Sequence, residues 1–326
     1  RRLSANGRNV TVRADVDYAK TNAKSLSLSN VHLYQVKDAT GVDSTYQTNR
    51  YLQTPTTAWT YSLQATYSEP LWRGTYLQFR YKYGYSRTTS DRATFDFSNL
   101  GEGFFGSQSP LYRGWNSYLS MLASPYESYL DQRLSRSSVY TNYTHELEMM
   151  LRFVGKKYKL NAGFMVQPQS SHFTQNYLGQ FADTTRSVFN VSPALELRYK
   201  FSDVSQLRIN YRGISSQPSM SDLLDIVDDS DPLNVHRGNP GLEPSFTNSL
   251  RFFYNTYRER RQQAFMTFLD YSNTRNAVSN RVTYDEITGG RTTQPDNING
   301  NWNANAGLMF NTAIDSAGVF NVNTFT

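Results

Sequence analysis

The sequence predicts an antiparallel transmembrane β-barrel, and three observations lead to this all-β fold class. Segments of about ten residues alternate between apolar and polar side chains, which is the side-chain period of a β-strand. Short turns and long connections alternate along the chain. No run of about 18 apolar residues is present, so the sequence offers no transmembrane helix.

The clearest strand covers residues 75–86, close to the roughly 9–11 residues with which a tilted strand crosses a bilayer. One face is apolar and aromatic: Leu77, Phe79, Tyr81, Tyr83 and Tyr85. The other face is mainly polar: Tyr76, Gln78, Arg80, Lys82, Gly84 and Ser86. We expect the first face to contact lipid and the second to line a lumen.

Eleven more segments share this alternation to varying degrees, which gives twelve expected strands. They cover residues 9–20, 25–37, 57–68, 138–152, 158–167, 186–200, 206–212, 244–257, 262–273 and 298–311, and a last segment after residue 317. The register of residues 262–273 is ambiguous, because Met266 and Phe268 lie opposite the other apolar positions. Pro193 has no N–H for the ladder and predicts a bulge or weakened pairing.

The connections supply the strongest argument. Short turns are expected near residues 22, 71, 156, 203, 259 and 315, and long loops at 38–56, 87–137, 168–185, 213–243 and 274–297. The last of these loops is expected to extend partly as a hairpin. Outer-membrane barrels place short turns in the periplasm and long loops outside the cell. Twelve strands on this pattern indicate part of a larger closed sheet, since lipid tolerates no unpaired strand edge.

The composition agrees with a barrel and excludes some other classes. The 326 residues are 14% aromatic and 18% charged, with 24 Tyr and no Cys. Their polar mean hydropathy is compatible with a barrel, because only alternate residues touch lipid. The net charge of +6 is spread along the chain, so no nucleic-acid partner is predicted. No signal peptide opens the chain, which starts abruptly at Arg1 and stops at Thr326 inside an expected strand, so we expect a piece of a longer protein.

One acidic loop is a weak candidate for a metal site. Carboxylates bind calcium, and four of them lie close together in the sequence: Asp225, Asp228, Asp229 and Asp231. The spacing does not match an EF-hand loop, and solvated loop carboxylates are the favoured interpretation. The same segment has Leu223, Leu224 and Val227 at helical spacing, which allows a short helix packed over the pore mouth.

Other chemistry is not indicated, and the sequence predicts no enzyme, no catalytic residue and no cofactor. The four histidines have no zinc-ligand spacing. Glu146 and Glu148 share one strand face, as a glycosidase pair would, but lining a wet lumen is the simpler interpretation. Inward positions form a mixed-charge surface suited to water or a polar plug: Arg13, Arg80, Lys82, Glu196, Arg198, Arg208 and Arg251.

Aromatic residues are expected to have two roles. Trp59, Tyr67 and Trp72 near one short turn, and Tyr83 and Tyr85 at the far strand end, suit interfacial girdles. Ordinary β-propensity is the alternative. Four aromatics of the longest loop are candidates either to bind a ligand or to order the loop: Phe104, Phe105, Tyr112 and Trp115.

Several motifs resemble one known family. They are Thr-Tyr-Gln-Thr-Asn-Arg-Tyr at 45–51, Tyr-Ser-Glu-Pro-Leu at 67–71 with the strand that follows, and Arg-Gly-Asn-Pro-Gly-Leu-Glu-Pro-Ser-Phe at 237–246. They resemble the Bacteroidetes outer-membrane β-barrel family related to TonB-dependent receptors. The resemblance implies a 22-strand barrel with an N-terminal plug. Residues 1–326 would form one partial barrel domain, with the plug and signal peptide outside this chain.

The resemblance also implies a function in the cell outer membrane. In this view outer loops capture a small ligand, a siderophore, glycan or peptide, and the TonB complex pulls on the plug. Two alternatives remain at this stage. One is a barrel without coupled transport, for assembly, adhesion or secretion, and the other is a secreted soluble β-protein that binds carbohydrate through its aromatics.

Overall fold

The computed structural model describes residues 7–37, 41–100, 119–223, 227–228, 231, 233–287, 289–315 and 319–326. Within these residues, one antiparallel sheet has the order β1-β2-β3-β4-β5-β6-β7-β10-β11-β14-β15. Its strands are β1 (Asn9–Lys37), β2 (Asp43–Trp72), β3 (Thr75–Asp96), β4 (Leu130–Val154), β5 (Tyr158–Tyr177), β6 (Gln180–Ser202), β7 (Ser205–Ser216), β10 (Ser245–Arg258), β11 (Gln263–Arg275), β14 (Asn301–Ala313) and β15 (Asn321–Phe325).

A smaller sheet, in the order β12-β13-β9-β8, lies near the outer ends of the long strands. Its strands are β8 (Val227–Asp228), β9 (Asn234–Arg237), β12 (Ala277–Tyr284) and β13 (Arg291–Ile298). The short helix α3 (Met220–Leu223) precedes it. Among the described residues, no helix is long and apolar enough to cross a membrane.

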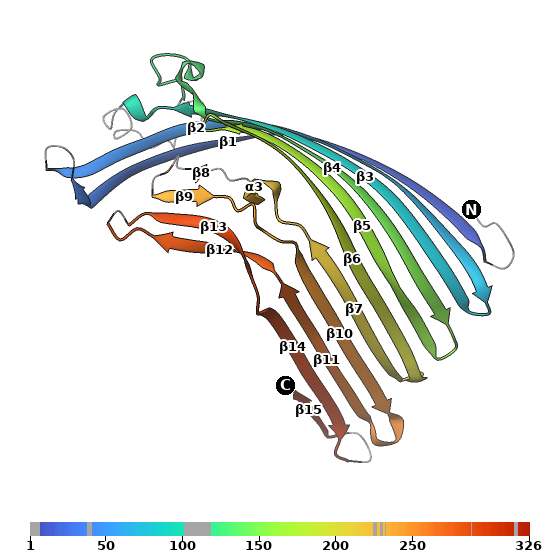
Figure 1. The fold of residues 1–326 in the computed structure, drawn as a ribbon. Helices are drawn as coiled ribbons and strands as arrows, with labels where there is room; N and C mark the ends of the chain where they lie inside the picture. The colour runs from blue at the N-terminus through green and yellow to red at the C-terminus, as the bar shows by residue number, and fades with distance from the viewer. Residues whose placement is uncertain are drawn as a thin grey trace.

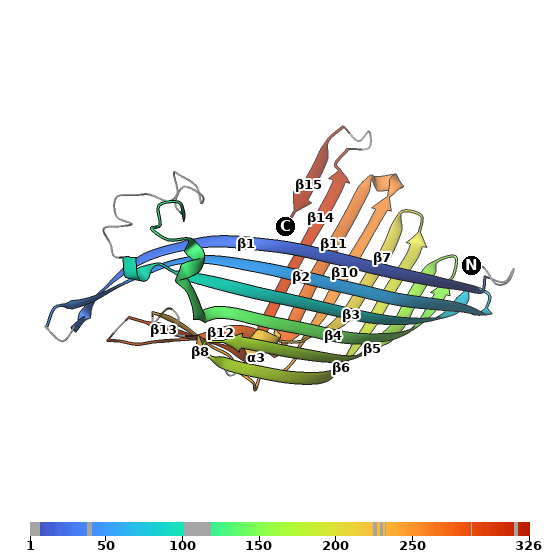
Figure 2. The same cartoon turned by 90° about the horizontal axis from the view of Figure 1, so that it is seen from above.

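The main sheet is a curved wall (Figure 1). Helix α3 and the smaller sheet lie on its concave side, whereas the segment leading into β4 lies on its convex side. The strand direction turns progressively from β1 to β15 when the sheet is seen from above (Figure 2), as the normal twist of a sheet requires. The sequence therefore predicted the fold class correctly.

All the tight connections expected at one edge of the sheet lie there, with one exception. β2–β3, β4–β5, β6–β7 and β10–β11 are joined at the lower right edge of Figure 1, where β14 also ends and β15 begins. The exception is the turn expected at residues 21–24, which is wrong. β1 is one strand of 29 residues, and Thr21 and Lys24 pair with Thr56 and Gln53 of β2. Eleven strands rather than twelve thus form the main sheet.

Two of the expected loops are mostly strand. Residues 43–56 continue β2, and residues 168–185 form a hairpin of β5 and β6 that turns at Leu178 and Gly179. Both turn residues have positive φ, as the tightest β-hairpins require. The long loop after β3 is also shorter than expected, because β3 reaches Asp96 and β4 begins at Leu130. The expected hairpin within residues 274–297 is confirmed by β12 and β13.

Prolines mark the places where the ladder is interrupted. Pro193 pairs with Phe164 of β5, but the β6–β7 ladder begins only at Ala194, so the predicted weakening is confirmed. Pro168 lies where the β4–β5 pairing skips two residues on each strand, and Pro55 where the β2–β3 pairing does so. Proline has no N–H to donate, so each sits where a neighbouring strand does not require one.

The two faces of the sheet differ as predicted. Large apolar side chains on the convex face are exposed: Val12, Val16, Trp59, Leu63, Phe79, Tyr81, Leu147, Met149, Phe164, Val191, Leu195, Trp302 and Leu308. An exposed apolar surface of this extent is not typical of a soluble protein. The ambiguous strand is also settled: Phe268 in β11 faces the concave side, where Gly307 of β14 leaves room for its ring.

Aromatic rings form a lateral row about ten residues from the tight turns. Tyr61, Tyr85 and Tyr143 are cross-strand neighbours, with ring centroids 4.7 and 5.1 Å apart. Trp59 joins this outer row by contacting Tyr18 at 4.5 Å, so its expected place near a short turn is wrong. Trp72 lies by its tight turn, 6.5 Å from Phe153. About ten tilted residues separate the two levels, which matches an apolar band roughly 25 Å tall.

Gly74 provides a test of the β2–β3 turn. Its φ is +76°, and a Cβ would collide with the backbone carbonyl of Val154. Gly179 has a similar φ of +73° but open space around it. We expect Gly74→Ala to lower the free energy of unfolding by more than the roughly 1 kcal/mol of Gly179→Ala. Urea unfolding of the full-length protein in lipid vesicles, followed by fluorescence, measures both; equal losses would contradict the close approach.

The assignment of faces gives a second test. Phe79 is on the convex face and Lys82 is on the concave face. We expect Phe79→Arg to cost about 2–4 kcal/mol, because a guanidinium would enter lipid near mid-membrane. Lys82→Gln should cost less than about 1 kcal/mol, because a neutral amide remains in a wet lumen. The same unfolding assay compares the two variants, and similar losses would show that the faces are misassigned.

Candidate functional site

The concave face carries a continuous row of polar side chains. Six laterally adjacent positions on β4, β5, β6, β7, β10 and β11 are Arg152, Asn161, Glu196, Asn210, Arg251 and Asp270. Two neighbouring pairs have opposite charges: Glu196 lies 3.3 Å from Lys159, and Arg251 lies 3.3 Å from Asp270. Arg198 and Arg208, by contrast, are like-charged cross-strand partners. The mixed-charge interior expected from the sequence is therefore present, and it faces the hollow side of the sheet.

The two glutamates that resembled a catalytic pair are each matched by a cation. Arg80 forms an ion pair with Glu148, its cross-strand partner, and Lys82 lies 3.9 Å from Glu146. Both carboxylates are largely buried among side chains of β3, β4 and β5. A carboxylate held by a cation across the ladder is suited to lining a lumen, as the simpler interpretation proposed.

Two hollows on the concave face differ in chemistry. The charged hollow, of about 720 Å³, lies over β1–β5 and includes Arg13, Asp15, Asp17, Lys82 and Glu146. The neutral hollow, of about 570 Å³, lies over β4–β7. It is lined by Tyr140, Gln167, Gln169, Phe173, Asn190 and residues 215–221. In the described part of the chain, no charged side chain lines the neutral hollow.

A segment after β7 folds inward over the outer part of the concave face. Met220 and Leu223 of α3 pack with Leu242 against Phe173 of β5 in a small buried cluster. The helix expected over the mouth is therefore present in part, since α3 ends at Leu223. Leu224 lies outside the described residues, and Val227 belongs to the strand β8. The sequence predicted a cover but not the aromatic floor that holds it.

Residues 119–129, which lead into β4, pack on the opposite, convex face. Tyr51, Phe95 and Phe97 form a buried cluster against Leu119, Leu122, Tyr126 and Tyr129. The ligand candidates of the longest loop, Phe104, Phe105, Tyr112 and Trp115, lie outside the described residues, so their role stays a prediction. The loop that carries them begins and ends on the outer extension of β3 and β4, away from the concave face.

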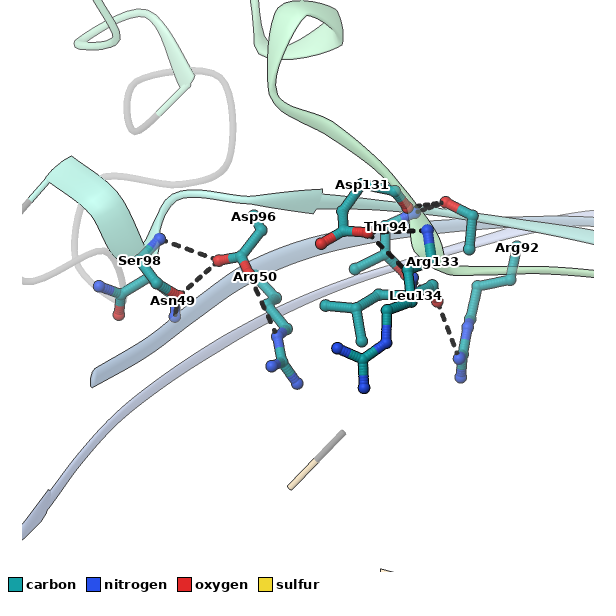
Figure 3. Close-up of polar contacts among 10 residues, drawn as sticks. Asn49, Arg50, Arg92, Thr94, Asp96, Ser98, Asp131, Arg133 and Leu134 are labelled. Carbon is teal, nitrogen blue, oxygen red and sulfur yellow. Dashed lines mark hydrogen bonds and ion pairs between the residues drawn. The ribbon is translucent and has the colours of Figure 1, made fainter. Parts of the chain in front are cut away.

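Polar contacts fix the base of that loop on both sides (Figure 3). On the entering side, Ser98 donates from its backbone and hydroxyl to Asp96, at 2.9 and 2.5 Å. On the returning side, the Leu134 carbonyl accepts from Arg92 and Thr94, at 3.2 and 3.0 Å. The Asp131 carboxylate holds the same turn through the backbone N–H of Leu134 at 3.1 Å. The loop thus starts from a rigid base.

The acidic loop gives little support for a metal site. Asp225 and Asp229 lie outside the described residues, and Asp228 is in β8. Asp231 uses both carboxylate oxygens within its own turn, accepting from the N–H of Leu233 and the side chain of Asn234. No group of three potential metal ligands occurs among the residues that the structure describes. A calcium site stays a prediction.

Asp231 has a different neighbour of interest. Partial burial raises the pKa of the Tyr46 phenol above its ordinary value, and the nearby Asp231 carboxylate raises it further. The Asp231 carboxylate thus places a negative charge of the inward-folded segment near the outer extension of β2.

The sequence predicted weakened pairing at Pro193 but not that the sheet opens between β6 and β7. Below Ala194 the two strands are paired, but above it β7 pairs with β10 alone. The signal was present in Pro193, which lacks an N–H, and in Gly213, where a Cβ would collide with the Phe246 ring. The neutral hollow lies at this opening, and Gln217 bridges it by donating to Asn190 at 2.8 Å.

The Arg80–Glu148 pair is a testable feature of the concave face. Its side chains are 27% and 18% exposed, whereas those of Arg251 and Asp270 are 77% and 51% exposed. Because water screens the second pair, a charge-reversal double-mutant cycle should give a coupling of about 1–3 kcal/mol for Arg80–Glu148 and below about 1 kcal/mol for Arg251–Asp270. Equilibrium unfolding of all six variants measures both, and equal couplings would refute the difference in screening.

Comparison with known proteins agrees with this architecture. The chain is similar to the ferric-catecholate import receptor Fiu of Escherichia coli K12, with a TM-score of 0.52 and 10% identity, over 94% of this chain and 43% of that one. It is similar to the copper transporter OprC, with a TM-score of 0.53 and 13% identity, over 94% of this chain and 44% of that one. The chain thus spans less than half of either structure, and at these identities the likeness shows the fold alone.

No curated protein sequence matches the chain. A family model matches almost all of it, residues 1–325, and is described as an outer membrane protein beta-barrel family. The curved antiparallel sheet, its apolar convex face and its polar concave face are the features that such a barrel requires. The chain belongs to the outer membrane protein β-barrel family, and its place is the outer membrane.

Proposed function

We propose that this chain is part of the barrel of a TonB-dependent-receptor-like protein that takes up a scarce nutrient, a siderophore, glycan or peptide. The observation that supports this most is the concave face, which is polar, carries several ion pairs and is partly covered at its outer end by an inward-folded segment. A lumen of this kind holds a polar occupant and admits a ligand from one end. The resemblance to receptor barrels supports the same conclusion.

In this proposal the plug and the signal peptide belong to parts of the full protein beyond residues 1–326. The outer hollows and loops bind the ligand, the lumen wall holds the plug, and the TonB complex moves the plug from the periplasmic side. The residues of this chain therefore bind the ligand and enclose the plug. We expect no enzymatic activity from them.

One observation favours a second candidate, a barrel without coupled transport. The cluster around Phe97 and Tyr129 places residues 119–129 on the convex side, outside the lumen. A segment in that position is available to another protein or to a surface, which suits adhesion or assembly. The soluble carbohydrate-binding alternative is not favoured, because the convex face exposes large apolar side chains on most of its strands.

Growth under nutrient limitation tests the proposal. In the organism that encodes the protein, we expect deletion of the gene to slow growth on at least one limiting source: ferric citrate, ferric catecholate, an oligosaccharide or a peptide. Reintroduction of the full-length gene should restore growth. A protonophore should abolish uptake but leave binding to the cell surface intact, because coupled transport requires an energised inner membrane whereas capture does not.

Two results would contradict the proposal. A deletion strain that grows normally on every source would favour the non-transporting barrel. Uptake that is unchanged by the protonophore would indicate a passive pore. The variant Lys82→Gln serves as the control for expression, since it changes one lumen charge and should leave the amount of protein in the outer membrane unchanged.

A further inference from the structure

The neutral hollow owes its existence to the opening between β6 and β7. Pro193 cannot donate to β7, and the crowding of Phe246 and Pro193 at Gly213 leaves no room for a side chain there. Above this point residues of β7 pair with β10, for example Ile214 with Thr247. The strands part, and the segment 215–221 closes the space from the inside.

The lining of this hollow is selective by chemistry. Gln167 and Asn190 are cross-strand neighbours at its floor, and Gln169 donates to Ser171 at 3.2 Å beside them. Tyr140 contributes a ring and a hydroxyl 3.2 Å from the same Ser171. Amides and hydroxyls both donate and accept hydrogen bonds, and the described lining holds no charge that would attract an ion.

One acceptor in the hollow has no partner. Gln217 donates to Asn190, which is only 4% exposed, but its own buried Oε1 atom has no hydrogen-bond partner in the structure. Buried polar atoms are nearly always satisfied. Because this oxygen is shielded from solvent, a ligand donor can reach it only if the Gln217 amide turns toward the hollow. A hydroxyl group is the matching donor, since it can bond this acceptor and accept from a neighbouring amide.

From these observations we infer that the neutral hollow binds an uncharged, hydroxyl-rich ligand of the oligosaccharide class. Binding of the ligand does not depend on the proposed uptake function, but its transport after binding does. Sugar hydroxyls match the amides of Gln167, Gln169 and Gln217, and the apolar face of a sugar ring matches Tyr140. A free peptide is disfavoured because its charged ends have no counter-charge here, and a ferric chelate fits the charged hollow better.

Binding to the purified full-length protein in detergent tests the inference. The probes for calorimetry are the neutral hexasaccharides of glucose, mannose and xylose, the acidic hexamer of galacturonic acid, ferric citrate, and a tetrapeptide with both ends capped. We expect at least one neutral hexasaccharide to bind. Gln217→Ala and Gln169→Ala should each weaken it by about tenfold, the effect of one lost hydrogen bond to a polar ligand.

The control is Lys156→Gln in the tight turn between β4 and β5, outside both hollows, which should leave the affinity for the hexasaccharide unchanged. Heat-dependent migration of the folded barrel in gels verifies that each variant is folded. Because Gln169 lies on a strand and Gln217 in a connection, at least one of the two variants is expected to pass that check.

Three outcomes would overturn the inference: no neutral hexasaccharide binds, binding is insensitive to both glutamine variants, or the capped tetrapeptide binds in a manner that those variants abolish. Its failure is separable from failure of the proposed function. A strain that needs this protein for iron or peptide uptake, with no sugar binding, would refute the oligosaccharide assignment alone. Sugar binding without any uptake defect would refute the transport function alone.

Discussion

Backbone hydrogen bonding is the constraint on which this structure depends. Within lipid, an unpaired N–H or C=O costs several kcal/mol, so every strand must be paired on both sides throughout the apolar band. The prolines that interrupt the ladder are placed accordingly. Pro168 and Pro193 lie about ten residues from the tight turns, which is the length that crosses the lipid, and Pro55 lies farther out. Pro70 lies at the opposite end, beside the β2–β3 turn.

The two faces follow from the same constraint. Once the ladder is complete, only side chains can distinguish lipid from water, and they do so by alternation. Phe79 and Tyr81 face outward between Arg80 and Lys82, whose charges are matched by Glu148 and Glu146 on β4. Pairing of these charges is important because the side chains lie next to lipid and protein of low dielectric constant, where an unpaired charge is costly. The result is a wall on which the charges of β3 are paired with those of β4 across the ladder.

This alternation explains how far the sequence alone could lead. Between the tight turns and the aromatic row, the contrast of lipid and water requires a period of two, and residues 75–86 show it plainly. Beyond the aromatic row, both faces of the sheet meet water or protein, so alternation of apolar and polar side chains is not required there. The polar residues Thr21–Lys24 of β1 lie in this region, and their sequence therefore resembled a turn. The sequence also could not predict that the segment after β7 packs on the concave face and the segment leading into β4 on the convex face. These positions depend on contacts between residues far apart in the sequence, such as Phe173 with Met220.

The neutral hollow lies outside the lipid, where backbone groups no longer have to be paired within the sheet. A gap between β6 and β7 inside the lipid would leave backbone groups unpaired, whereas the same gap above it can be satisfied by side chains and solvent. Gln217 spans part of the gap by donating a hydrogen bond to Asn190, while its Oε1 atom has no hydrogen-bond partner in the structure. Pro193 thus has two consequences: it ends the β6–β7 ladder at the boundary of the band, and it thereby creates a polar opening on the lumen side. A position that weakens the sheet is tolerated there because the opening lies outside the lipid, and the candidate binding site exists because the sheet is weakened.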